Sequence, residues 1–276
     1  LSLTRVNPSG ASKLVLLGLK LRRGRSQFPH PPGKPTQALK KKSKTTLNTH
    51  KNTLHAPENI GRIETMLTVI GEALVDVVHQ HDGETRAYPG GSPMNVAVGA
   101  RRLGHLTNFV GHYGPDAYGK SIDAHLEASQ VTLPFEHSAE RTSVAQATIG
   151  ADGAAEYEFD ITWSLDSVAE KLTELARTSD AVHTGSIAAM LEPGAHVVAA
   201  AFEAARDSAL LSYDPNCRPT LIHNVDEGRA WAEKFVSLST VVKASDEDLQ
   251  WLYPDRSLDD SARAWLGLGA ELMGIT

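Results

Sequence analysis

The sequence predicts an α/β fold, in which a doubly wound, mostly parallel sheet with helices on both faces is joined to a small second sheet. Two observations carry this prediction. From residue 180 to the end, short apolar strand patterns alternate with helix patterns, which is typical of a parallel sheet covered by helices. Residues 141–160 break this rhythm, because they hold two alternating runs on either side of the turn GADG, the pattern of a β-hairpin.

The first 65 residues differ sharply from the rest of the chain. They hold 13 of its 27 Lys and Arg but two of its 33 acids, so their net charge is +11 and that of residues 66–276 is −17. With many Pro and Gly residues and a basic run at 40–44, they bury too little apolar surface to offset the entropy of ordering. We expect residues 1–65 to form a disordered basic extension.

This extension has three interpretations. A transit peptide fits its Arg- and Ser-rich, acid-poor composition, and a nucleic-acid-binding tail fits its charge. We favour the third, that the extension is not a native part of the protein. The chain starts at Leu1, and Met66 directly precedes the first clear strand pattern. The folded domain is therefore expected to span residues 66–276.

The domain opens with the apolar run LTVIGEALVDVV at residues 67–78, which is typical of a buried parallel strand. Gly71 and Glu72 interrupt this run and mark the tip of the strand, where we expect functional residues. A short strand near 84–89 does not fit the strand–helix alternation. We expect it to pair with the hairpin at 141–160 in the small second sheet, which forms a lid.

Helix signals follow directly. Ser92 as N-cap, Pro93 at the first position and Gly104 as terminator delimit one helix. Residues 106–114 are then predicted as a buried strand and 118–131 as a helix. The later part alternates between strands at 180–187, 209–216, 240–245 and 270–276 and helices at 194–208, 226–238 and 258–269.

Composition excludes several classes of protein. The single cysteine, Cys217, rules out an internal disulfide and favours a reducing cytoplasm. No apolar run approaches the roughly 18–20 residues of a membrane span. The acidic main body argues against nucleic acid as its partner. We therefore expect a cytoplasmic protein with neither a membrane nor a nucleic-acid partner.

Residues 114–121, GPDAYGKS, match the phosphate-binding loop pattern G-x-x-x-x-G-K-[ST]. Such a loop needs backbone N–H groups around a phosphate, and Pro115 removes one of them. Asp116 would place a negative charge beside the phosphates. A P-loop NTPase using these residues is therefore an alternative function that the pattern allows and the chemistry disfavours.

A wider pattern carries more weight. The segment PGGSPMNVAVGARRLG, followed by VGHYGPDAYG, resembles the N-terminal signature of the PfkB (ribokinase-like) carbohydrate kinases. That signature has a Gly pair, an Asn four or five residues on, a helix, and a G-x-x-G-x-D-x-x-G segment. GEALVD, AAEYEF, DPNCR and VKASDED resemble its fructokinase branch, in order over 66–276. The resemblance assigns the glycines of 114–119 to this signature, with Lys120 following by chance.

The resemblance implies a ribokinase-like fold and ATP- and Mg²⁺-dependent phosphorylation of a sugar hydroxyl, with fructose as the expected sugar. Asp76 ends a buried strand, where sugar hydroxyls would supply the donors that its carboxylate needs. Asn95 both donates and accepts hydrogen bonds, and a Gly pair lets the backbone approach a ligand closely. Arg218 is expected to contact phosphate or the transition state. The implied sugar-binding residues are Asp76, Gly90, Gly91, Asn95, Arg141, Phe159 and Asn216.

The family's N-x-x-E region, which supports magnesium and phosphate, corresponds to VVKASDED at residues 241–248. Lys243 and Ser245 are the implied cofactor-binding residues. Ser245 stands where Asn is common, and Asp248 stands where Glu is usual. Because Asp is one methylene shorter, Asp248 is expected to reach Mg²⁺ through water.

The family's second signature, G-A-G-D, does not occur in this sequence. The resemblance places the catalytic Asp there, beyond Thr276, so we expect an incomplete fold, an unpaired edge on the strand at 272–276, and no activity in this chain. A non-catalytic sugar-binding protein is the second alternative. Any homodimer is expected to form through the lid.

Overall fold

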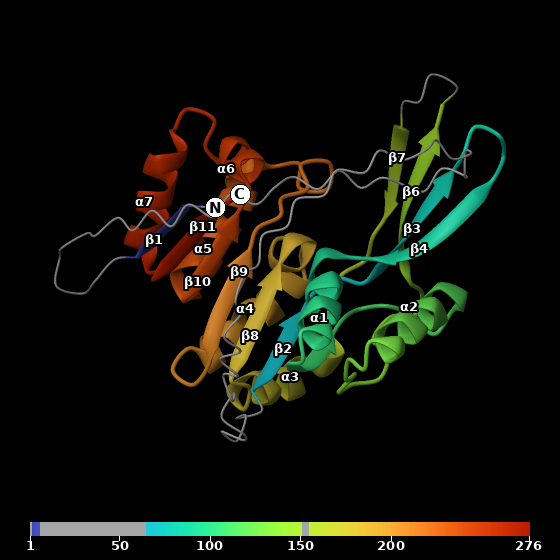
Figure 1. Cartoon of the computed structure of the whole chain (residues 1–276), viewed down its shortest axis with the longest axis horizontal. Coiled ribbons are helices and arrows are strands. Elements are labelled where there is room, and N and C mark those ends of the chain that lie inside the picture. The colour runs from blue at the N-terminus through green and yellow to red at the C-terminus, as the bar shows by residue number, and fades with distance from the viewer. Residues whose placement is uncertain (1, 6–64, 151–154) are drawn as a thin grey trace, which may run out of the picture. The chain divides into compact units, whose positions relative to one another are not determined.

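The chain builds a seven-stranded sheet in the order β1-β11-β10-β9-β8-β2-β5 (Figure 1). The computed structural model describes residues 2–5, 65–150 and 155–276. All neighbouring strands in this sheet run parallel except β1, which is antiparallel to β11. The strands are β1 (Ser2–Arg5), β2 (Met66–Ile70), β5 (Leu106–Val110), β8 (Ala181–Gly185), β9 (Leu210–Asp214), β10 (Val241–Ala244) and β11 (Leu272–Ile275).

A second sheet of four strands, in the order β4-β3-β6-β7, contains the strands predicted for the lid, and we use that name for it (Figure 1). The β3–β6 pair is parallel and the other two pairs are antiparallel, so this sheet is mixed. The strands predicted near 84–89 and within 141–160 both belong to it. Its strands are β3 (Leu74–His79), β4 (Thr85–Gly90), β6 (Ser143–Ile149) and β7 (Ala155–Asp160).

The prediction of one continuous strand at 67–78 is wrong. The chain leaves the main sheet after Ile70 and enters the lid at Leu74, so that β2 and β3 belong to different sheets. Gly71 still donates its N–H to the carbonyl of Val110, at 3.0 Å, as the last bond of the β2–β5 ladder. An apolar pattern records burial, and both strands are buried, so the pattern could not show the change of sheet.

Five helices lie close to their predicted positions, whereas those at Ala169–Arg177 and Asp246–Leu252 were not predicted. The prediction of Ser92 as the N-cap of the first helix is wrong, because Gly91 occupies the cap and Ser92 is the first helical residue. Side chains of Asp116, Asn224, Ser245 and Ser257 cap four of the later helices. None of the described helices has the length and apolar character needed to cross a bilayer. The helices are α1 (Ser92–Arg102), α2 (Ala117–Ala128), α3 (Ala169–Arg177), α4 (Gly194–Ala205), α5 (Val225–Leu238), α6 (Asp246–Leu252) and α7 (Leu258–Leu268), with short 3₁₀ turns η1 (Asp166–Val168) and η2 (Ser186–Ala189).

Apolar clusters cover both faces of the main sheet. Successive residues of β2 point to opposite faces: Val69 joins a cluster with α1 and α2, whereas Ile70 joins the larger cluster with α3 to α7. Phe202, Phe235 and Trp265 are fully buried in the larger cluster. This arrangement confirms the doubly covered parallel sheet and places the carboxyl ends of its strands at one edge.

The outer edge of β11 is paired, contrary to the expected free edge. Strand β1 aligns with it from Ser2 opposite Ile275 to Arg5 opposite Leu272. An open strand edge offers a row of unpaired N–H and C=O groups, which an antiparallel segment satisfies. The remainder of the predicted basic extension lies outside the described residues.

Candidate sugar-binding site

A cleft of about 510 Å³ lies between the lid and the carboxyl ends of the main strands. It brings together residues that are up to about 150 positions apart in the chain. The residues that line it are Glu72, Leu74, Asp76, Gly91, Ser92, Asn95, Val96, Ala145, Phe159, Ser186, Ile187, Asn216, Arg218 and Leu221. Six predicted site residues are among them: Asp76, Gly91, Asn95, Phe159, Asn216 and Arg218.

Strand β3 presents Asp76 to this cleft because its side chains alternate between two faces. Val75 and Val77 are buried in the cluster with α1 and α2, so Asp76 projects from the opposite face of the lid. Across the lid, Asp76 pairs with Ala145, which in turn pairs with Phe159. Directly opposite residues share a face, and this row therefore forms the lid side of the cleft.

The electrostatics of the cleft centre on Asp76 and Arg218. Partial burial raises the pKa of the Asp76 carboxyl above its usual range, and the positive charge of Arg218 opposes that rise. No hydrogen bond from another described residue reaches the Asp76 carboxylate. Its oxygens are free to accept from a ligand.

The Gly pair fits tightly beside these groups. Any side chain at Gly90 would overlap the Asp76 carboxylate, although Gly90 itself does not line the cleft. Gly91 has a φ of 118°, which favours glycine, and a side chain there would overlap the carbonyl of Glu72. The turn therefore needs glycine at 91, whereas a side chain at 90 would displace the Asp76 carboxylate. The same turn sets Asn95 in the first turn of α1 facing the cleft.

Two lining residues hold unusual backbone conformations. Ser186 and Asn216 have φ values of 56° and 35°, in the left-handed region that few non-glycine residues adopt. Strain of this kind gathers at functional sites. Arg218 donates to the side-chain oxygen of Asn216 at 2.6 Å, so the loop after β9 holds its own guanidinium in place.

The predicted phosphate-side residues lie outside the cleft, at the ends of β9 and β10. Lys243 forms an ion pair with Asp214 at 3.2 Å. Asp248 is buried, and its carboxylate accepts from the backbone N–H of Cys217 at 2.7 Å and from both the N–H and the hydroxyl of Ser245 at 2.8 Å. Asp248 thus fastens α6 to the loop after β9.

The fit of Mg²⁺ depends on Asp214, which sequence reasoning missed. Its Oδ1 is buried and has no hydrogen-bond partner within the described ranges. Burial raises the pKa of this carboxyl, and Lys243 opposes the rise. Those ranges hold no cluster of three or more His, Cys, Asp or Glu that would cage a metal. Mg²⁺ commonly uses one or two carboxylates with water and phosphates, so Asp214 fits it.

Arg141 does not reach the cleft. It is exposed and forms an ion pair with Asp160 at the base of the lid hairpin. This pair joins the segment before β6 to the end of β7.

The P-loop alternative fails on geometry. Asp116 accepts from the N–H of Gly119 at 2.8 Å and from the N–H and hydroxyl of Thr142 at 2.7 and 2.8 Å. Lys120 donates its N–H to the carbonyl of Asp116. The donors that would cradle a phosphate are therefore used within the protein. The segment fastens α2 to the lid strand β6.

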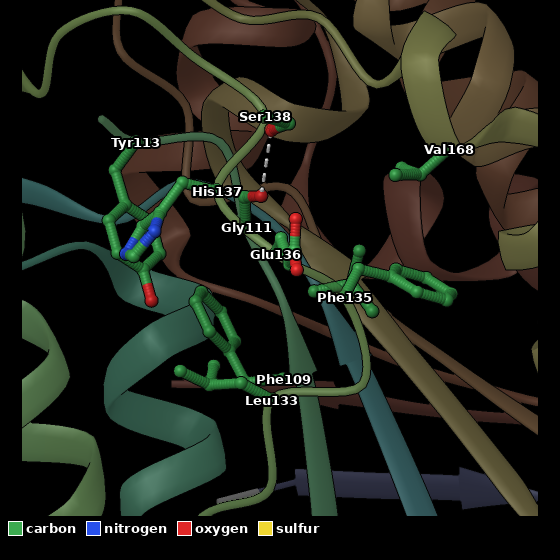
Figure 2. Close-up of a pocket in the computed structure, with 10 residues that line it drawn as sticks. Phe109, Gly111, Tyr113, Leu133, Phe135, Glu136, His137, Ser138 and Val168 are labelled. Carbon is green, nitrogen blue, oxygen red and sulfur yellow. Dashed lines mark hydrogen bonds between the residues drawn. The ribbon is translucent and has the colours of Figure 1, made fainter. Parts of the chain in front are cut away.

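Figure 2 shows a separate, much smaller cavity of about 50 Å³ at the end of β5. Phe109, Phe135 and Tyr113 supply apolar walls, and the Ser138 hydroxyl donates to the carbonyl of Gly111 at 3.3 Å (Figure 2). None of its lining residues lines the larger cleft. It has room for a few water molecules and not for a sugar.

Comparison with known proteins identifies the family of this chain. A family model described as pfkB family carbohydrate kinase matches residues 64–271. Fructokinase-2 of Solanum lycopersicum is 33% identical over 211 residues, which cover 71% of this chain and 64% of that protein. Fructokinase-1 of Oryza sativa is 35% identical over 214 residues, 72% of this chain and 66% of that protein.

Solved structures show the same fold. The fructokinase of Xylella fastidiosa with bound ATP superposes with a TM-score of 0.67 at 23% identity, covering 78% of this chain and 72% of that chain. A double mutant of the Vibrio cholerae fructokinase, bound to fructose, ADP and potassium ion, has a TM-score of 0.64 at 26% identity, covering 77% and 70%. The chain spans about 64% of the length of the Solanum relative. By the family match and the shared fold, the chain belongs to the PfkB family of carbohydrate kinases.

Proposed function

We propose that the cleft binds fructose and that the protein transfers a phosphoryl group from ATP to one of its hydroxyls. One observation carries the proposal: the cleft gathers Asp76, Asn95 and Asn216 with the cation Arg218 from three separate segments. Oxygen acceptors, amide donors and a glycine backbone suit a polyhydroxylated ligand. The names of the relatives support a sugar kinase, and fructose is the sugar bound in one similar structure.

Each residue has a distinct part in this proposal. Asp76 accepts hydrogen bonds from sugar hydroxyls, and Asn95 orients the ring from the first turn of α1. Phe159 and Ala145 form an apolar wall that excludes water. Arg218 lies where it stabilises negative charge on the transferred group, because phosphoryl transfer depends mainly on positioning and on charge.

We propose that ATP binds at the ends of β9 and β10. Lys243 and Ser245 would contact the phosphates of ATP. Asp214 would hold Mg²⁺ through its free oxygen, and Asp248 would keep the strand ends aligned. When bound, Mg²⁺ supplies neutralisation of phosphate charge.

The test of sugar binding is calorimetry of the 276-residue chain with fructose. Asp76→Ala should weaken binding at least about tenfold, since a hydrogen bond to a charged group is worth about 1.5–3 kcal/mol. Asp255→Ala, an exposed carboxylate away from the cleft, is the matched control and should leave binding unchanged. Unchanged affinity in Asp76→Ala would remove this residue from the site.

Turnover is tested separately. We propose that the present sequence transfers phosphate poorly because it lacks G-A-G-D, the segment that the family resemblance associates with the general base. A coupled ADP-release assay with fructose, ATP and Mg²⁺ should show turnover in a version extended by a segment bearing that motif. Equal turnover in the two would show that another residue acts as the base. Sugar binding without turnover in either would favour a non-catalytic sugar-binding protein.

We also propose that a homodimer forms through the lid. Tyr157 and Tyr88 are 63% and 50% exposed there, and Tyr157 stacks on Phe159 at a centroid separation of 6.2 Å. Exposed aromatic groups on one sheet favour burial against a partner. Light scattering should give a dimer for the wild type and a monomer for Tyr157→Asp. A monomeric wild type would contradict the proposal.

The single buried Cys217 supports a reducing, cytoplasmic setting.

A further inference from the structure

The junction between the two sheets contains a buried acid that the proposed chemistry does not use. Residues 71–73 connect β2 of the main sheet to β3 of the lid, and Glu72 in their centre is 5% exposed. No ion pair to Glu72 occurs within residues 65–150 and 155–276. A carboxyl group buried without a cation is costly, so its position calls for a physical reason.

The contacts of Glu72 reach two other segments that line the cleft, α1 and η2. Its Oε2 accepts the N–H of Ala188 in η2 at 3.3 Å. The hydroxyl of Ser186 and the backbone N–H of Ser92 face the carboxylate and lower its pKa. The Glu72 carbonyl packs so closely on Gly91 that a side chain there would overlap it. Glu72 thus contacts the start of α1 and two residues of the turn after β8.

The segments that Glu72 joins carry the sugar-facing groups. The lid begins two residues later and brings Asp76 to the cleft, while α1 brings Asn95. Ser186, whose strained φ of 56° must be held by its surroundings, is itself a contact of Glu72. A shift at this junction would therefore move Asp76 and Asn95 relative to each other.

We propose that Glu72 is a positioning residue, which fastens the lid junction to η2 and to the start of α1 and so sets the spacing of the groups that bind the sugar. The inference deepens the proposed function and depends on it for the choice of fructose as the probe. Glu72 would affect sugar binding indirectly, by fixing the positions of Asp76 and Asn95.

The contacts of Glu72 with η2 and the start of α1 depend on the protonation state of its carboxyl group. Burial raises the pKa of Glu72 to about 7, and the hydrogen bonds from its own backbone, Ser186, Ala188 and Ser92 oppose the rise. The charged groups that face the same cleft are Asp76 on β3 and Arg218 after β9, whereas α1 and η2 contribute uncharged side chains. If opening the junction admits water, the pKa falls toward its usual value, so a rise in pH favours the open form.

The first experiment follows amide hydrogen exchange in the peptide that contains Ala188, with rates corrected for intrinsic pH dependence, from about pH 5.5 to about pH 8.5. Wild-type exchange should accelerate roughly threefold or more across this range. Glu72→Gln keeps the shape and an acceptor oxygen but no charge, and should remove this acceleration. Glu158→Gln, an exposed acid on the lid, is the matched control and should behave as the wild type.

The second experiment measures fructose affinity by calorimetry over the same range. Affinity of the wild type should fall as pH rises through about 7, with the fall absent in Glu72→Gln and binding roughly tenfold weaker in Glu72→Ala. Wild-type pH dependence in Glu72→Gln, or no pH dependence in the wild type, would overturn the inference. If the wild type does not bind fructose, the proposed function fails, and the exchange experiment still decides the role of Glu72.

Discussion

The cleft and the ends of β9 and β10 both present carboxylates at the edge of the main sheet, but they satisfy them differently. Asp76 lies open to the cleft, and no hydrogen bond from the described residues reaches its oxygens. Asp248 is 6% exposed and accepts three hydrogen bonds from the protein. Both residues are aspartates, so residue type does not distinguish them. A carboxylate whose oxygens lack donors from the protein can bind a ligand, whereas one whose oxygens already accept such bonds stabilises the fold.

The largest effect is expected where the carboxylate is saturated. Asp248→Ala would leave the N–H groups of Cys217 and Ser245 without their acceptor, and should lower the free energy of unfolding by roughly 4 kcal/mol. Urea unfolding followed by circular dichroism measures this. Asp248→Asn keeps part of the geometry and should cost about half as much. A loss below about 1 kcal/mol in Asp248→Ala would break the comparison.

Glu72 is the intermediate case, buried but without a cation. The folded-state pKa of about 7 lies above the ordinary value of 4.5, so between these pH values the unfolded chain has released a proton that the folded chain keeps. Stability from this group is therefore full below about pH 4.5 and is lost as pH rises to about 7. Glu72→Gln should gain up to about 3 kcal/mol relative to wild type between about pH 5 and pH 8, measured by urea unfolding. Parallel pH profiles of the two proteins would contradict this.

Substitution of Asp76 should affect fructose affinity more than stability, whereas substitution of Asp248 should mainly affect stability. Asp76→Ala removes no hydrogen bond within the protein, so the free energy of unfolding should change by less than about 0.5 kcal/mol. The same variant is expected to lose fructose affinity at least about tenfold. Urea unfolding and fructose calorimetry of Asp76→Ala on one preparation measure both effects. A large loss of stability would show that Asp76, like Asp248, stabilises the fold.

The smallest effect is expected at Lys120, the lysine of the P-loop-like segment. Its side chain is exposed, and the surrounding N–H groups already bond Asp116. Lys120→Ala should change the free energy of unfolding by less than about 0.5 kcal/mol and leave the effect of ATP on the melting temperature as in the wild type. Loss of an ATP effect in this variant would revive the P-loop alternative.

Sequence by itself determined most of the segments that become strands and helices, because burial repeats with the period of each element and glycine, proline and capping residues mark the ends. It did not indicate β1, α3 or α6. The sequence also pointed to Asp76, Asn95, Asn216 and Arg218 through the motifs that contain them, although Asp76 lies within β3 and not at the end of a strand as predicted. The structure brings these four to one cleft.

Tertiary structure alone decided which polar groups have partners. The bond from Ala188 to Glu72 spans 116 positions, and that from Cys217 to Asp248 spans 31. The run at 67–78 likewise shows burial but not the passage between two sheets. Periodicity reports whether a residue is buried, whereas the state of a carboxylate oxygen depends on donors that distant segments supply on folding. For this reason only the structure showed that the Asp248 carboxylate is bonded within the protein, that one Asp214 oxygen has no partner among the described residues, and that Glu72 is buried at the junction of the two sheets.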